Sequence, residues 1–165
     1  MTPVGLAFRS AFAESPVIRR SVREMGLVGT LFTPANVGPW PAVVTLTGAG
    51  GGIDEAPARA LAEEGFAAFA LATHNAEGLP QALREIPVEY CERAIGWVRR
   101  NVKPDREFIA IRGWSRGGEL ALILGAMFSR VSAVLAYAPR TYVGLADPRA
   151  HNHGDPAAKI GRAHV

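Results

Sequence analysis

The chain has 165 residues, which is enough for one domain with a buried core. Hydrophobic residues make up 48% and charged residues 20% of it, and this composition excludes disordered and fibrous classes. The net charge is +3, but Lys and Arg are scattered along the chain, so we expect no nucleic-acid partner. The single cysteine, Cys91, excludes an internal disulfide and a thiolate metal cluster. A single cysteine also fits a reducing compartment. No apolar run approaches the length of a membrane span, so we expect a cytoplasmic protein.

The N-terminal segment predicts a hairpin followed by a loop. Residues 17–24 and 27–32 alternate weakly between apolar and polar side chains, and Gly26 separates the two runs. Residues 33–41 hold three prolines and a glycine, which is typical of a loop. We therefore expect residues 1–40 to form a hairpin and a loop that lead into a sheet.

The middle of the chain alternates between buried strands and amphipathic helices. The strands are expected at residues 42–47, 66–72, 109–113 and 131–138. Helices are expected from near Asp54 to Gly65, through Ile86 to Val98, and over 120–128, with the Asp54 carboxylate capping the first of them. This order predicts an α/β fold with a mostly parallel sheet, helices on both faces, and a site at the carboxyl ends of the strands. The core is expected to cover residues 41–143, and residues 144–165 are expected to form an irregular tail.

The sequence Gly113-Trp114-Ser115-Arg116-Gly117 joins the third of these strands directly to a helix. Strand, tight turn and helix is the setting in which Gly-x-Ser-x-Gly forms a nucleophile elbow, and Gly113 and Gly117 relieve the crowding of that turn. Ser115 would stand at a helix N-terminus, which favours a developing negative charge. We therefore predict that Ser115 is a nucleophile that needs a histidine base oriented by a carboxylate.

The run Gly48-Ala49-Gly50-Gly51-Gly52 follows the first buried strand. An oxyanion hole in this architecture uses the backbone N–H after the serine, here that of Arg116, and a second N–H from the loop after an earlier strand. We therefore assign Arg116, Gly48, Ala49 and Gly50 to that hole. A flexible linker and a phosphate-binding loop are the alternatives, although neither a Gly-Lys-Ser/Thr ending nor the Gly-x-Gly-x-x-Gly spacing is present.

Other residue types that can carry chemistry favour structural roles. Cys91 lies in a predicted helix and is expected to pack in the core. Trp97 and Trp114 are expected in the core or in a site wall, and His74 either lines the pocket or is a polar loop residue. We expect no cofactor and no metal ion.

Several blocks together resemble the C-terminal catalytic domain of acyl-CoA thioesterases and bile acid-CoA:amino acid N-acyltransferases, a branch of the α/β hydrolases. The blocks are 47–52, 64–72, 77–80, 86–90 and 113–120. The resemblance implies hydrolysis of an acyl-CoA thioester to a fatty acid and CoA, or transfer of the acyl group to an amine, through an acyl-enzyme on Ser115. A serine at the elbow favours hydrolysis, since the amino-acid transferases of the family look typically cysteine-based. Arg116 stands where the family more often has lysine, which leaves the backbone donor unaffected.

Two departures from the family pattern accompany the resemblance. Family members usually carry an N-terminal β-sandwich domain, and here fewer than 40 residues would precede the catalytic part. The acid and the histidine follow the serine on later strand-end loops, and we expect those C-terminal strands to be missing. Residues 160–165 resemble one translated frame of a sequencing-library adapter, so we expect the natural sequence to end near Lys159 or earlier.

The tail offers a substitute acid and base. Its candidates are Asp147, His151, His153 and Asp155. A histidine that reached Ser115 from the loop after the same strand would be unusual, so we expect this chain by itself to be inactive or nearly so. Carboxylesterase or dienelactone-hydrolase-like activity and a non-catalytic binding module remain alternatives, and the sequence does not determine the oligomeric state.

Overall fold

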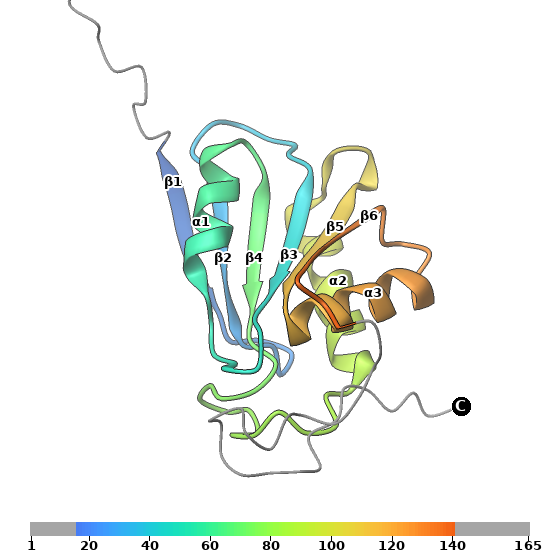
Figure 1. Ribbon diagram of the computed structural model, residues 1–165. Helices are drawn as coiled ribbons and strands as arrows, with labels where there is room; N and C mark the ends of the chain where they lie inside the picture. The colour runs from blue at the N-terminus through green and yellow to red at the C-terminus, as the bar shows by residue number, and fades with distance from the viewer. Residues whose placement is uncertain (1–15, 141–165) are drawn as a thin grey trace, which may run out of the picture.

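The computed structural model describes residues 16–140, which form a six-stranded sheet with helices on both faces (Figure 1). The strand order is β1-β2-β4-β3-β5-β6. The strands are β1 (Val17–Val22), β2 (Gly29–Pro34), β3 (Ala42–Leu46), β4 (Ala67–Leu71), β5 (Ile109–Trp114) and β6 (Ala133–Tyr137).

Strand pairing changes direction across the sheet. The predicted hairpin is present, since β1 pairs with β2 antiparallel, and β2 pairs antiparallel with β4. From β4 onward the pairs β4–β3, β3–β5 and β5–β6 are parallel. The mostly parallel α/β sheet predicted from the alternating pattern is therefore confirmed. Parallel strands point their carboxyl ends the same way, so the loops after β3, β4 and β5 lie at one edge.

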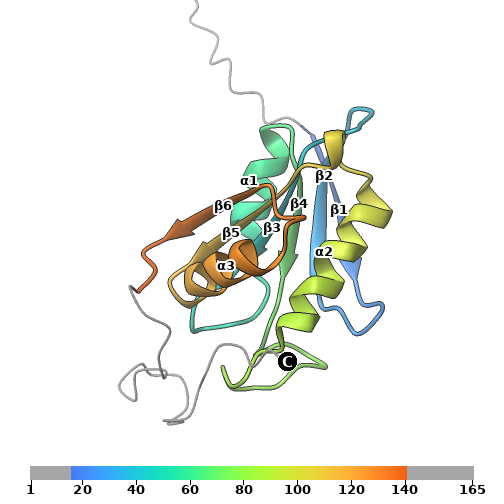
Figure 2. The ribbon, with the colours of Figure 1, turned by 90° about the vertical axis from the view of Figure 1, so that its right-hand side faces the viewer.

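The helices divide between the two faces of the sheet (Figure 2). They are α1 (Glu55–Glu63), α2 (Val88–Val102) and α3 (Arg116–Met127), and a short 3-10 turn covers Asp105–Glu107. On one face, Ala58 and Ala62 of α1 pack with Phe32, Ala68 and Ala70. On the other face, α2 and α3 bury the larger apolar cluster around Phe69 and Trp97, whose rings lie 5.1 Å apart. Small alanines bring α1 close to the sheet, and bulky side chains fill the opposite layer.

Two helix starts differ from the sequence-based expectation. Asp54 is the residue before α1, but its side chain makes no capping hydrogen bond, so the predicted cap is wrong. Instead, the Glu55 carboxylate in the first turn accepts hydrogen bonds from Arg19 and Thr30. Ile86 lies before α2 because Pro87 disfavours helical backbone at the residue that precedes it.

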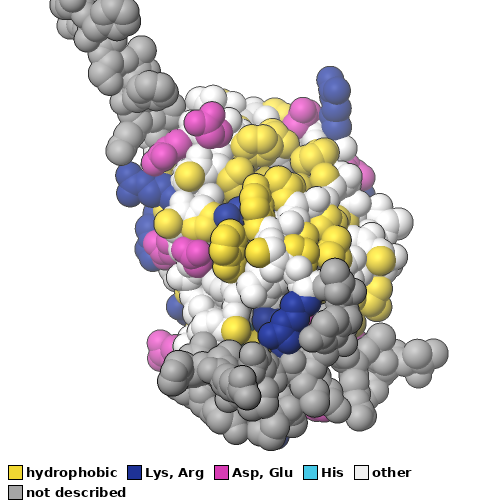
Figure 3. Space-filling view, viewed as in Figure 1, with side chains coloured by type: hydrophobic (Ala, Val, Ile, Leu, Met, Phe, Trp, Pro, Cys, Tyr) yellow, Lys and Arg dark blue, Asp and Glu magenta, His cyan; other side chains and the backbone are white. Residues whose placement is uncertain are grey.

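The last described strand is less buried than predicted. Residues of β6 are partly or fully exposed, with Leu135 42% and Tyr137 43% exposed. The register pairs these two with Arg112 and Trp114 of β5, on the face that α1 covers elsewhere. Figure 3 shows the hydrophobic side chains gathered on this face. The four-residue patch Arg112, Trp114, Leu135 and Tyr137 is thus partly open to solvent, whereas α1 covers the middle of the sheet on this face.

Within residues 16–140, none of the helices is both long and apolar enough to cross a membrane.

Candidate functional site

The Gly-x-Ser-x-Gly sequence forms a sharp turn between β5 and α3. Ser115 has φ 51° and ψ −113°, an unusual conformation for a residue with a side chain, and the next residue already belongs to α3. The turn is continuous with the sheet, because the Ser115 N–H donates to the Tyr137 carbonyl at 2.8 Å. A backbone of this kind costs of order 1–3 kcal/mol and persists only where its surroundings enforce it.

The close packing around the turn requires glycine at positions 113 and 117. A Cβ on Gly113 would overlap the carbonyl oxygen of Gly117, and a Cβ on Gly117 would overlap that of Thr47. Both obstacles are backbone atoms, which cannot swing aside as a side chain can. The two glycines therefore let β5, the start of α3 and the end of β3 approach one another closely.

The glycine loop, residues 48–52, meets this turn at the edge of the sheet. Leu46 at the end of β3 is in register with Gly113 of β5, so the two strands end side by side. A Cβ on Gly48 would lie 3.5 Å from the Ser115 Cβ and 3.4 Å from the Trp114 carbonyl oxygen. The structure thus brings together the elbow and the loop that the sequence assigned to one site.

The glycine loop is held by the two residues that follow Thr73, after β4. The His74 ring lies 3.0 Å from the Ala49 carbonyl oxygen through Nε2, and the Asn75 side chain donates to the Gly50 carbonyl at 2.8 Å. The Gly52 N–H donates to the His74 carbonyl, also at 2.8 Å. His74 is only 2% exposed, so it is a buried part of the site's support and not a solvated loop residue.

The first turn of α3 contains a buried ion pair. Arg116 and Glu119 are 4% and 3% exposed, and Arg116 Nη1 donates to Glu119 Oε2 at 2.8 Å. The other Glu119 oxygen, Oε1, is buried without a hydrogen-bond partner. A carboxylate near a helix N-terminus is favourably placed, and its pairing with Arg116 braces the turn that carries Ser115.

The cysteine and the two tryptophans singled out in the sequence differ in burial. Cys91 is buried in α2, and burial raises the pKa of its thiol to about 12, so it is a core residue. Trp97 is fully buried, whereas Trp114, next to Ser115, is 55% exposed and stacks on Tyr137. No group of three or more His, Cys, Asp or Glu side chains within residues 16–140 could hold a metal ion.

A base for Ser115 is not supplied by the described part of the chain. His74 is the one histidine among residues 16–140, and its ring nitrogens contact Thr73 and Ala49. The other candidates lie outside the described residues: Asp147, His151, His153, Asp155 and the segment 160–165. Residues 16–140 therefore bring together the serine, the Arg116 backbone and the glycine loop, without an acid–base pair beside them.

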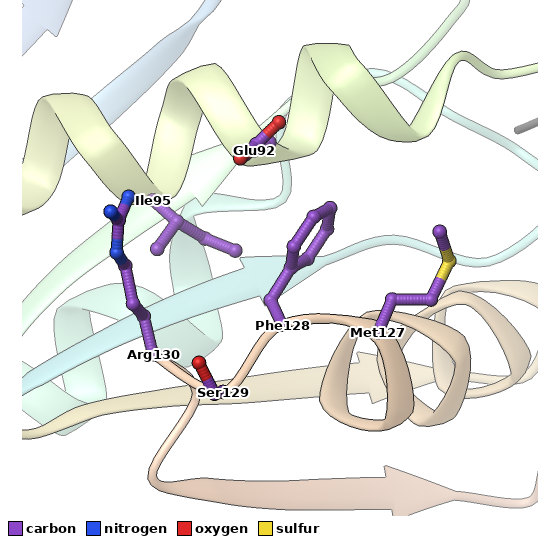
Figure 4. A pocket seen from close by; sticks show the side chains of 6 residues that line it. All are labelled: Glu92, Ile95, Met127, Phe128, Ser129 and Arg130. Atoms are coloured by element: carbon purple, nitrogen blue, oxygen red, sulfur yellow. The ribbon is translucent and has the colours of Figure 1, made fainter. Parts of the chain in front are cut away.

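One cavity of about 200 Å³ lies between α2 and the C-terminal end of α3 (Figure 4). It is lined by Glu92, Ile95, Met127, Phe128, Ser129 and Arg130. Ser115 precedes the first residue of this 12-residue helix, so roughly 18 Å of helix separates the serine from the cavity. The cavity therefore does not belong to the Ser115 site.

Solved structures with the same arrangement define the class of fold. A putative dienelactone hydrolase from Klebsiella pneumoniae matches with a TM-score of 0.63 and 20% identity, covering 83% of this chain and 63% of that chain. Brefeldin A esterase, titled a bacterial homologue of human hormone-sensitive lipase, matches with a TM-score of 0.57 and 21% identity, covering 83% of this chain and 43% of the esterase. The chain has an α/β-hydrolase fold.

Sequence comparison narrows the class to one branch. The family model "BAAT / Acyl-CoA thioester hydrolase C terminal" matches residues 86–152. Rat acyl-coenzyme A thioesterase 1 is 37% identical over 122 residues, which are 73% of this chain and 29% of the rat protein. Mouse peroxisomal succinyl-coenzyme A thioesterase is 37% identical over 123 residues, 74% of this chain and 29% of the mouse protein. The resemblance to the acyl-CoA thioesterase branch of the α/β hydrolases is confirmed, and the chain spans less than a third of the length of these relatives.

Proposed function

We propose that this chain carries the nucleophile and the oxyanion hole of a serine hydrolase that acts on acyl-CoA thioesters. The observation that carries the proposal is the Ser115 turn, with φ 51°, at the start of α3 and against Gly48. The similarity to acyl-coenzyme A thioesterases supports the substrate class. A cytoplasmic location stays a prediction, since curated relatives include proteins named mitochondrial and peroxisomal.

In the proposed reaction, Ser115 Oγ attacks the thioester carbonyl carbon while a base takes the hydroxyl proton. The carbonyl oxygen becomes an oxyanion, which accepts hydrogen bonds from the Arg116 N–H and from an N–H of Gly48, Ala49 or Gly50. The C–S bond then breaks, CoA leaves as its thiol after protonation, and water hydrolyses the acyl-Ser115 ester to a carboxylic acid. Each oxyanion donor is worth roughly 3 kcal/mol of transition-state stabilisation.

The acid and base must come from outside residues 16–140. His74, the one histidine in that range, is hydrogen-bonded within the glycine loop, so it is not available to Ser115 Oγ. Oxyanion donors and substrate binding without a base support only a weak residual rate. We therefore propose that residues 16–140 alone hydrolyse thioesters slowly, and that turnover depends on a histidine and a carboxylate beyond them.

A second candidate is hydrolysis of simple carboxylic esters. It is favoured by the structural similarity to a putative dienelactone hydrolase and to an esterase, which share the fold at 20–21% identity. A third is a binding module without catalysis, favoured by the lack of a base within residues 16–140.

Turnover of a thioester and an ester with the same acyl group distinguishes the three candidate functions. The longest version of the protein that its reading frame encodes should hydrolyse palmitoyl-CoA with a higher kcat/KM than p-nitrophenyl palmitate, and Ser115→Ala should abolish both activities. A preference for the simple ester would favour the second candidate. Equal rates for the unsubstituted protein and Ser115→Ala would leave only the binding module.

A further inference from the structure

His74 is placed between two polar groups that fix the direction of its ring. The Thr73 hydroxyl lies 3.1 Å from Nδ1, and the Ala49 carbonyl oxygen lies 3.0 Å from Nε2. Because a carbonyl oxygen can only accept, Nε2 must carry the proton that is shared with Ala49. The ring is 2% exposed, so water does not compete for this hydrogen bond.

The same segment also fixes the next two peptide groups, Gly50–Gly51 and Gly51–Gly52. Asn75 donates to the Gly50 carbonyl, and the Gly52 N–H donates to the His74 carbonyl, each at 2.8 Å. Gly51 has φ +63°, and a Cβ there would lie 2.7 Å from His74 Nε2 and from the His74 carbonyl oxygen. The loop after β4 is thus packed directly against this segment and holds the Ala49 and Gly50 carbonyl groups and the Gly52 N–H toward itself.

The direction of one carbonyl determines the direction of the next N–H. A trans peptide group is planar, so its C=O and N–H point in opposite directions. With the Ala49 carbonyl turned toward His74, the Gly50 N–H points away from His74. Rotation of this peptide group by half a turn would reverse both and would present a carbonyl oxygen where the site needs a donor.

We propose that His74 is a positioning residue for the oxyanion hole. It holds the Ala49–Gly50 peptide group so that the Gly50 N–H, and not the Ala49 carbonyl, faces the oxyanion formed at Ser115. The inference rests on the proposed serine-hydrolase function and adds to it a residue that acts through the loop without touching the substrate. Glycines at 50, 51 and 52 make the loop easy to rotate, so a side-chain anchor is needed to select one orientation.

The test compares His74→Leu with His74→Gln. Leucine fills similar space without a donor, whereas the glutamine amide can donate to the Ala49 carbonyl. The first readout is the rate at which a fluorophosphonate probe labels Ser115. We expect a loss of about 10-fold to 100-fold for His74→Leu, less than the full removal of an oxyanion donor, and substantial recovery in His74→Gln. Val98→Ala is the matched control, because it removes buried packing in α2 and leaves the loop's hydrogen bonds intact.

The second readout does not depend on activity. Hydrogen exchange of the Gly51 and Gly52 amides, which donate to Gly48 and His74, should speed up roughly fivefold to tenfold in His74→Leu and much less in Val98→Ala. If His74→Leu does not fold, Thr73→Val tests the same anchor, since it keeps the imidazole and removes the hydroxyl that orients it.

The outcomes distinguish the proposed role of His74 from the proposed serine-hydrolase function. Unchanged labelling in His74→Leu, or unchanged exchange of the loop amides, would overturn the role of His74 even with Ser115 reactive. Equal losses in His74→Leu and His74→Gln would also overturn it. If Ser115 is not labelled in the longest version of the protein that its reading frame encodes, the proposed function fails, and the exchange measurement then decides whether His74 fixes the loop.

Discussion

The elbow and the glycine loop meet at Ser115, but they are held in place by different means. At the elbow, Gly113 and Gly117 face backbone carbonyl groups at distances that admit no Cβ. In the glycine loop, the His74 and Asn75 side chains hold the Ala49 and Gly50 carbonyl groups through hydrogen bonds. The nucleophile is therefore positioned by close backbone packing, and its proposed oxyanion partner by hydrogen bonds from a neighbouring loop.

The difference predicts different responses to substitution. A change that adds atoms to the elbow must move strands and should therefore cost folding stability. A change that removes a donor beside the glycine loop should leave the sheet intact and lower reactivity instead. Stability and reactivity are thus expected to separate between the two segments.

The largest effect is expected from Gly117→Ala. Its Cβ would overlap the Thr47 carbonyl oxygen and lie 2.7 Å from that of Leu46, so either α3 or β3 must shift. We expect a loss of more than about 4 kcal/mol in the free energy of unfolding, measured by urea denaturation. Gly96→Ala in α2 is the control, because its Cβ meets the flexible Arg100 side chain, and it should be neutral or slightly stabilising. A Gly117→Ala protein as stable as Gly96→Ala would contradict the account of the elbow.

The buried pair in the first turn of α3 should give the next largest effect. Replacement of Glu119 by leucine leaves the Arg116 guanidinium, 4% exposed, without the carboxylate that accepts from it at 2.8 Å. We expect a loss of about 3 kcal/mol, and the double variant Arg116→Met, Glu119→Leu should recover much of it. Additive losses in this double-mutant cycle would show that the two side chains do not act as a pair.

A smaller effect of defined sign is expected at the nucleophile itself. Ser115→Gly should be more stable than Ser115→Ala by about 1 kcal/mol, since only glycine adopts a positive φ without strain. Both variants should lose labelling by an active-site serine probe. Equal thermal unfolding midpoints for the two would mean that the turn is not strained.

The smallest effect is expected at the edge of the glycine loop. Asn75→Asp keeps the shape of the side chain but replaces the amide that donates to the Gly50 carbonyl. Because Asn75 is exposed, the expected loss of unfolding free energy is about 1 kcal/mol or less. Urea denaturation and Ser115 labelling should both change less than in His74→Leu. A larger loss of labelling than in His74→Leu would place the main anchor of the loop at Asn75.

The contrast between the elbow and the glycine loop also explains which features could be predicted from the sequence. The elbow is a local pattern of five residues between an apolar strand and a helix, so its geometry could be inferred from the chain alone. The role of His74 depends on β4 lying beside β3, a long-range pairing that no short motif encodes. The one available signal was a histidine in the loop that follows a buried strand at the carboxyl edge of the sheet.

Two further differences have similar causes. The apolar run 131–138 predicted a strand correctly, but whether both faces of a strand are covered depends on what packs there, and Leu135 and Tyr137 are exposed. The Asp54 residue type predicted a cap, but the side chain makes no hydrogen bond to the helix, and Glu55 pairs with Arg19 instead. Residue type alone did not identify which of the two carboxylates, that of Asp54 or that of Glu55, accepts hydrogen bonds at the start of α1.

Covalent labelling is the most direct test of Ser115 as a nucleophile. The longest version of the protein that its reading frame encodes would be treated with a fluorophosphonate probe, digested and mapped by mass spectrometry, with Ser115→Ala as the control. We expect one modified peptide, which contains Ser115 and is lost in Ser115→Ala. Absence of label on Ser115 in a folded protein would show that Ser115 is not a nucleophile.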